Sequence, residues 1–286
     1  MYVVLGATGQ VGGAVARHLL EQKLSLRVVV RSAEKGEPFA AKACEVAVAN
    51  VLDTAALTLA FRGAEGVFVL IPPLFDPSEG FPEARAIYAS ITTALKAAHP
   101  GRVICLSTVG AQASEPNLLN QLGLMEQEFG KLDIPVAFLR ASWFMENFAW
   151  DVASAKDEGV VHSFLQPLER KIPMVATDDI GRTATGLLQE DWQGRRVVEL
   201  QGPELLGPDD VANAFTRVLD RKVKADVVPR ESWETIFLSA GMKNPTPRIQ
   251  MLEGFNAGWI SFEGGEVEQR TGSTTLEAVL AGLAKR

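Results

Sequence analysis

Cysteine, histidine and tyrosine are scarce in this sequence of 286 residues, which holds two cysteines, three histidines and two tyrosines. Two cysteines, Cys44 and Cys105, are too few for the disulfide framework of a small secreted domain, and both lie in apolar runs. We therefore expect reduced thiols in a reducing compartment. His18, His99 and His162 are scattered, with no cysteine or carboxylate at the spacing of metal ligands, so no metal site is expected.

Long apolar runs and basic runs are also missing. No stretch reaches the roughly 18 apolar residues of a membrane-spanning helix, and the chain opens with a predicted strand instead of a signal peptide. The net charge of −7 and the pI near 5.2 disfavour nucleic acid and anionic lipid as partners. We expect a cytoplasmic protein that acts on a small molecule, as a monomer or homodimer.

The first half of the chain alternates short apolar runs with amphipathic segments. The runs are apolar throughout, which is typical of parallel strands covered by helices on both faces. The predicted strands are Tyr2–Leu5, Leu26–Val30, Cys44–Val48, Val67–Ile71, Arg102–Leu106 and Val136–Leu139, and the clearest helices are Gln10–Gln22, Phe81–Ala98 and Leu118–Lys131. This pattern predicts an α/β fold of the Rossmann type, with a doubly wound parallel sheet.

The alternation weakens in the second half of the chain. Shorter strands are predicted at Lys171–Ala176, Val197–Leu200 and Ala225–Val228, with helices that start at Thr177 and Pro208. We expect residues 1–150 to form a dinucleotide-binding domain and residues 151–286 to form a smaller α+β substrate lobe. The lobe should pack on the first domain, and its later segments should return to the first sheet.

The first predicted strand leads into a glycine-rich turn and then into an amphipathic helix. In this context Gly6 permits a tight turn, Gly9 lets the backbone approach a pyrophosphate, and Gly12 lets the helix pack against the strand. The predicted cofactor contacts of the turn are Gly6, Thr8, Gly9, Gln10, Val11 and Gly12. The alternative is a glycine-rich turn that binds no ligand.

A basic residue follows the second predicted strand, at the place where NAD-specific folds usually offer an acidic one. Arg31, together with Ser32 and Lys35, could pair with the 2′-phosphate of NADP through charge-assisted hydrogen bonds. NADP(H) is therefore predicted in preference to NAD. The alternative is a solvated basic cluster at the start of a helix.

Three further strand ends supply candidate cofactor contacts, because ligands of open α/β sheets lie outside the carboxyl ends of the strands. Asn50 and Val51 are assigned to the adenine, Ile71, Pro72 and Pro73 to the nicotinamide ribose, and Ser107 and Thr108 to the nicotinamide. Each of these residues also fits an ordinary strand-terminating turn.

An ordered set of motifs resembles the NmrA-like family of atypical short-chain dehydrogenases/reductases. The motifs are Gly6–Gly12, Val29–Arg31, Leu139–Asn147, Thr177–Gly181, Gln201–Glu204, Gly241–Met242 and Thr271–Leu276. The resemblance spans most of the chain, whereas the glycine turn alone would not identify the family. It implies a reductase that passes hydride from NADP(H) to a planar acceptor such as a quinone or dye. The alternative within the family is a regulatory protein that senses NADP(H) without turnover.

The sequence lacks the catalytic pair of the usual short-chain dehydrogenase, a tyrosine whose pKa is lowered by a lysine four residues later. Its two tyrosines are Tyr2, in the first strand, and Tyr88, which is followed four residues later by Thr92. Leu122 and Gln127 stand where many relatives keep a histidine or lysine. No catalytic residue is therefore assigned. Hydride transfer to an electron-poor acceptor, with water or the acceptor itself handling protons, is favoured over alcohol oxidation.

Aromatic side chains after the fourth and sixth predicted strands are candidates for the acceptor pocket, because a planar acceptor can stack on them. The candidate substrate contacts are Phe75, Gln127, Trp143, Phe144 and Asn147, with Phe148 and Trp150 in the same aromatic set. The alternative is that the aromatic residues belong to the core. Glu146 and Asn147 begin a helical stretch after the sixth strand, and either residue orients the substrate or caps that segment.

Overall fold

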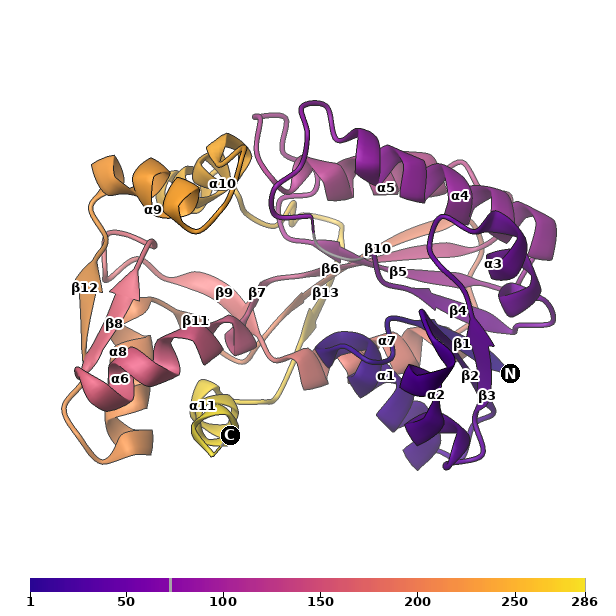
Figure 1. The fold of residues 1–286 in the computed structure, drawn as a ribbon, viewed down its shortest axis with the longest axis horizontal. Helices are drawn as coiled ribbons and strands as arrows, with labels where there is room; N and C mark the ends of the chain where they lie inside the picture. Colours follow the sequence, from indigo (N-terminus) through magenta and orange to yellow (C-terminus); the bar gives the residue numbers. More distant parts are fainter. Residues whose placement is uncertain (72–73, 286) are drawn as a thin grey trace.

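A parallel sheet of eight strands forms the centre of the larger part of the molecule (Figure 1). The structure is a computed structural model that describes residues 1–71 and 74–285. From one edge to the other, the strands are β3 (Glu45–Val48), β2 (Leu26–Val30), β1 (Tyr2–Leu5), β4 (Gly66–Val69), β5 (Val103–Thr108), β6 (Val136–Ala141), β10 (Arg195–Gln201) and β13 (Glu268–Thr271). The six strands predicted in the first half are all present, with ends that shift by one or two residues.

Helices cover both faces of this sheet. On one face lie α3 (Thr54–Phe61), α4 (Pro82–Ala98) and α5 (Asn120–Phe129), and on the other lie α1 (Gln10–Glu21), α2 (Ala33–Ala40) and α7 (Thr177–Gln189) (Figure 1). Alternate residues of each strand enter the two cores, so Val3 packs with the α3–α4 layer and Val4 with the α1–α7 layer. The predicted doubly wound α/β fold is confirmed.

Three elements from the second half complete the larger part of the molecule. Strands β10 and β13 extend the sheet beyond β6, and α7 packs on α1. The predicted strand Val197–Leu200 therefore belongs to the main sheet and not to the smaller lobe. Helices α1 and α7 approach closely because residue 181 is glycine: a Cβ on Gly181 would lie 2.5 Å from the Cβ of Ala14.

The smaller lobe is built from short strands and helices. A three-stranded sheet contains β7 (Trp143–Phe144), β9 (Ile172–Val175) and β11 (Leu205–Leu206), and β8 (Val160–Ser163) pairs with β12 (Lys224–Val227). The helices are the 3₁₀ segments η1 (Met145–Asp151) and η2 (Arg230–Ser232), with α6 (Val152–Asp157), α8 (Pro208–Leu219), α9 (Trp233–Ser239), α10 (Thr246–Ala257) and α11 (Leu276–Ala284). Among the described residues, no helix combines the length and the apolar character needed to cross a membrane.

A buried ionic network links β5, β6 and β10 to α5. Arg140 on β6 donates to both carboxylate oxygens of Glu126, at 2.9 and 2.7 Å, and to Glu263 at 2.7 Å. Ser107 on β5 donates to Glu126 at 2.6 Å, and Glu199 on β10 lies 3.6 Å from the Arg140 guanidinium. Burial alone would lower the pKa of Arg140, but its hydrogen bonds to Glu126 and Glu263 raise it above the ordinary value. The guanidinium therefore stays charged at the centre of the network.

Replacing Arg140 with methionine should destabilise the fold strongly, because Glu199 is fully buried and Glu126 nearly so, and both would lose their cation. The expected loss is about 3–5 kcal/mol in the free energy of unfolding, measured by urea denaturation followed by circular dichroism. The control is Lys131→Met, which removes an exposed ion pair with Glu128 and should change the free energy by less than about 1 kcal/mol. Equal losses for the two variants would contradict this account of the network.

Candidate functional site

The turn between β1 and α1 leaves backbone amides free at the carboxyl edge of the sheet, the side on which β1 to β6 end. Gly6 has φ of +72°, and the amide of Gly9 donates to its carbonyl at 2.9 Å. Helix α1 begins at Gln10 with Gly9 as its N-cap, no side chain caps it, and its first turn holds no acidic residue. Since the first amides of a helix have no partner within it, this helix start can bind an anion.

The three glycines of the turn serve different purposes. A Cβ on Gly12 would lie 2.2 Å from the carbonyl oxygen of Gly6, so the chain itself excludes a larger residue there. Gly6 has a positive φ, a backbone conformation that glycine adopts without strain and other residues rarely adopt. Gly9 is exposed, has an ordinary φ of −94°, and its Cβ would meet only the Gly6 oxygen at 3.4 Å. Neither packing nor backbone conformation requires glycine at position 9.

The predicted phosphate-binding residues lie after β2, the neighbour of β1 in the sheet. Leu5 pairs with Val29, so Arg31 follows β2 on the same edge as the glycine turn. Arg31 and Lys35 are exposed, and Ser32 is the N-cap of α2 but makes no capping hydrogen bond through its side chain. Among the residues the structure describes, neither basic side chain forms an ion pair.

The other predicted cofactor contacts divide into two groups. Asn50 is exposed and its side-chain oxygen accepts from the amide of Leu52 at 3.0 Å, while Thr108 donates to the Val109 carbonyl at 3.1 Å. The partly buried side chains of Val51 and Ile71 pack against the α3–α4 core, and Ser107 is buried with its hydroxyl on Glu126. Ser107 is thus committed to the ionic network. The predicted contacts Pro72 and Pro73 lie outside the described residues.

Neither tyrosine can act as a proton donor at the carboxyl edge. Tyr88 is 2% exposed, and its hydroxyl donates to the carbonyl of Gln121 at 2.8 Å. Burial raises the pKa of Tyr88, and burial likewise raises that of Tyr2 in the first strand. On α5, Leu122 packs into the core and Gln127 is exposed on the side opposite the buried residues of the helix. Gln127 therefore faces solvent.

The predicted aromatic set is split between the core and the surface. Trp143 packs edge-on against Phe255 of α10, with ring centres 5.2 Å apart, Phe144 pairs with β9, and Phe148 is buried. Trp143 and Phe148 form part of the lobe's packing, whereas Phe144 packs against the α1–α7 core. Phe75 and Trp150 remain 48% and 77% exposed.

Glu146 has a structural partner at the start of α7, whereas the capping alternative predicted one in its own segment, η1. Its carboxylate accepts from the amide of Thr177 at 2.9 Å and from the hydroxyl of the same residue at 2.7 Å. Burial raises the pKa of Glu146, and these hydrogen bonds oppose the rise. Glu146 thus stabilises the start of α7, while its neighbour Asn147 is exposed on η1.

Comparison with known proteins gives the family. The sequence matches the NmrA-like family over residues 2–277. The chain belongs to this family. It is 25% identical to an NAD(P)H azoreductase of Xenophilus azovorans over 244 residues, 85% of this chain and 82% of that protein. It is 24% identical to quinone oxidoreductase 2 of Escherichia coli over 260 residues, 90% of this chain and 87% of that protein.

Solved structures share the fold of this NmrA-like chain from end to end. The triphenylmethane reductase of Citrobacter sp. matches with a TM-score of 0.82 at 20% identity, covering 100% of this chain and 99% of that one. The quinone oxidoreductase of Escherichia coli, solved in complex with NADPH, matches with a TM-score of 0.77 at 22% identity, covering 100% and 98%.

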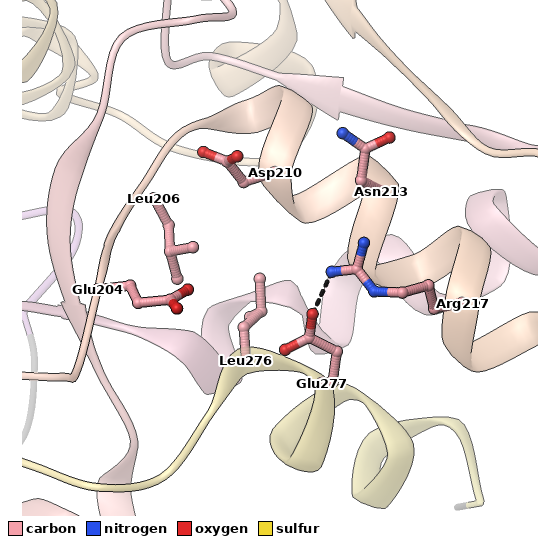
Figure 2. Close-up of a pocket in the computed structure, with 7 residues that line it drawn as sticks. All are labelled: Glu204, Leu206, Asp210, Asn213, Arg217, Leu276 and Glu277. Carbon is pink, nitrogen blue, oxygen red and sulfur yellow. Dashed lines mark hydrogen bonds and ion pairs between the residues drawn. The ribbon is translucent and has the colours of Figure 1, made fainter.

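The cavities found in this NmrA-like chain hold none of the predicted contacts. A small cavity of about 110 Å³ lies between β11, α8 and α11, where Arg217 binds Glu277 (Figure 2). A larger one of about 650 Å³ lies between residues 78–81, residues 116–120 and the start of α10. The first is lined mostly by polar and charged groups, of which Arg217 and Glu277 pair with each other, and the lining of neither cavity includes a residue of the glycine turn. The larger cavity is bordered by Lys243 and Asn244, whose amides donate to Asp76.

Gly12→Ala should destabilise this NmrA-like chain, because the new Cβ would overlap the backbone of the turn. The expected loss is about 1–3 kcal/mol in the free energy of unfolding, measured by denaturant titration. Gly9→Ala is the matched control: its Cβ has room, so the loss should stay below about 1 kcal/mol. A Gly12→Ala protein as stable as the Gly9→Ala protein would mean that the turn relaxes without cost.

Proposed function

We propose that this chain is an NADP(H)-dependent reductase that transfers hydride to a small planar acceptor such as a quinone. The observation behind the proposal is Gly9, exposed at an uncapped helix start, where a side chain would fit the protein but obstruct a diphosphate. The azoreductase, quinone oxidoreductase and triphenylmethane reductase relatives support a reductase by their names.

The residues at the strand ends fit the two halves of a dinucleotide. The amides at the start of α1 would hold the diphosphate, while Arg31, Ser32 and Lys35 would hold the 2′-phosphate. Arg31 and Lys35 are exposed, and the Ser32 hydroxyl makes no capping hydrogen bond. These groups suit a phosphate better than a ribose diol, so NADP is proposed over NAD. The quinone oxidoreductase relative, solved with NADPH, supports this choice.

The reaction that fits is one that needs no strong acid from the protein. A bound nicotinamide supplies the hydride, the quinone takes up the hydride and one proton to become a hydroquinone, and NADPH becomes NADP⁺. The tyrosines are buried, and burial raises the pKa of the Cys105 thiol well above its ordinary value. We therefore assign the proton to water and the acceptor to an electron-poor class, since alcohol oxidation would need a protein base.

The direct test is NADPH oxidation with a panel of quinones and cationic and anionic dyes. We expect steady turnover with at least one acceptor, and Gly9→Ala should weaken NADPH binding by about ten-fold or more while leaving the melting temperature nearly unchanged. Calorimetry gives the affinity and absorbance gives the rate. Tight NADPH binding with no oxidation by any acceptor would overturn the reductase and leave a dinucleotide-sensing regulator.

Arg31→Ala should weaken NADPH binding about ten-fold or more and change NADH binding less than about two-fold, because only NADPH carries the 2′-phosphate. Both dissociation constants can be measured by calorimetry at fixed ionic strength. The control is Lys23→Ala, which removes an equal charge just beyond the C-terminal end of α1 and should leave both affinities unchanged. An equal effect of Arg31→Ala on the two nucleotides would remove the phosphate-binding role.

A further inference from the structure

Arg248, on the first turn of α10, is a half-buried arginine held among aromatic rings. Its guanidinium carbon lies 4.5 Å from the ring centre of Phe237 and 5.9 Å from those of Phe75 and Trp150. Within the described part of the chain, its hydrogen-bonding partner is the sulfur of Met242, 3.8 Å from Nη1, and no carboxylate pairs with it. A positive charge is thus partly desolvated without an opposite charge.

The surroundings of Arg248 compensate its charge only in part. A guanidinium carries five N–H donors, whereas aromatic faces and a thioether accept weakly. Burial lowers the pKa of Arg248, and no nearby carboxylate opposes that shift. Arginine nevertheless stays protonated in proteins, so a charged donor group is left for solvent or a ligand.

Arg230 on the same lobe provides a comparison. Its guanidinium lies 5.1 Å from the ring centre of Trp233, and it also pairs with Glu253 at 2.6 Å. Contact with an aromatic ring is therefore compatible with a carboxylate partner in this lobe. The chain holds 35 acidic residues against 28 Lys and Arg, so the missing partner at Arg248 does not follow from a shortage of acids.

The rings around Arg248 come from the carboxyl edge of the main sheet. Phe75 follows β4, and Trp150 lies in η1, which follows β6 and β7. Asp76 fixes the first of these loops against the lobe, because its carboxylate accepts from the amides of Lys243 and Asn244 just before α10. The carboxylate next to Phe75 is thereby bound to the backbone before α10, and the loops that carry Phe75 and Trp150 meet at Arg248.

The third ring near Arg248, that of Phe237, packs against another aromatic residue. Phe237 stacks on Phe164 with ring centres 5.3 Å apart and an interplanar angle of 20°. Phe237 is buried, whereas Phe75 and Trp150 are open to solvent. The arrangement combines a fixed arginine with two exposed aromatic faces.

We propose that Arg248 binds an oxyanion substituent, a carboxylate or a sulfonate, on the planar acceptor, while Phe75 and Trp150 contact the acceptor's rings. A planar guanidinium forms two parallel hydrogen bonds with such a group. The inference rests on the proposed reductase function and adds a preference for anionic acceptors.

The test compares naphthoquinone with naphthoquinone sulfonate as acceptors at saturating NADPH. Arg248→Met, which keeps much of the apolar stem, should raise KM for the sulfonate about ten-fold or more and leave kcat/KM for naphthoquinone within about two-fold. Arg248→Lys should retain part of the preference. The matched control Arg230→Met removes an arginine that also lies over a ring, and it should alter neither acceptor. Similar losses for both quinones in Arg248→Met would overturn the proposal.

A binding measurement separates this inference from the reductase itself. Naphthalene sulfonate cannot accept hydride, and calorimetry with NADP⁺ present should show binding to the wild type that is about ten-fold or more weaker for Arg248→Met. Loss of that binding in the variant supports the anion site even if no acceptor is reduced. Equal affinity for the wild type and a folded Arg248→Met protein, with unchanged circular dichroism, would overturn the anion site whether or not the chain turns over.

Discussion

The uncapped start of α1 is the constraint on which the site depends. Its amides are available because the helix begins directly after the turn, with Gly9 in the position where a capping side chain would otherwise stand. The rest of the helix is held firmly: Gly12 lies against the turn, and Gly181 of α7 lies against Ala14. A helix fixed along its length with free donors at its start suits the proposed anion site, because binding would need no rearrangement.

The same close packing explains why β10, β13 and α7 return to the first sheet. Helix α7 covers the face on which α1 lies, and the Arg140 network joins β10 and residues 263–264 to β5, β6 and α5. Those ionic groups sit near the ends of the strands, yet they bind one another. Ser107 and Glu126 therefore bind each other and stabilise the edge of the sheet.

Local patterns predicted the larger part of the fold because the strands of the first half are short, mostly apolar runs between helices, whereas β13 is polar and was not predicted. The positions of the glycine turn and of the basic residue after β2 were predictable for the same reason, since both follow directly from neighbouring strands and helices in the sequence. The burial of the aromatic side chains was not predictable, because it depends on contacts with the distant helix α10. Trp143 packs against Phe255 of that helix, whereas Phe75 lies exposed near Arg248. No local sequence pattern predicted the position of Arg248, because its neighbour Phe75 is separated from it by more than half of the sequence.

The missing acid and the unpaired arginine fit a single account of selectivity. In the proposed reaction no tyrosine or lysine protonates the product, so the rate would depend on how electron-poor the acceptor is and how well it is placed. Two exposed rings place any flat molecule with little discrimination, because every aromatic compound has a face that can stack. A fixed guanidinium adds direction and charge preference, since an oxyanion on the acceptor can reach it in only a few orientations. Discrimination among acceptors would then come from binding at α10, and reactivity from the acceptor's own affinity for hydride.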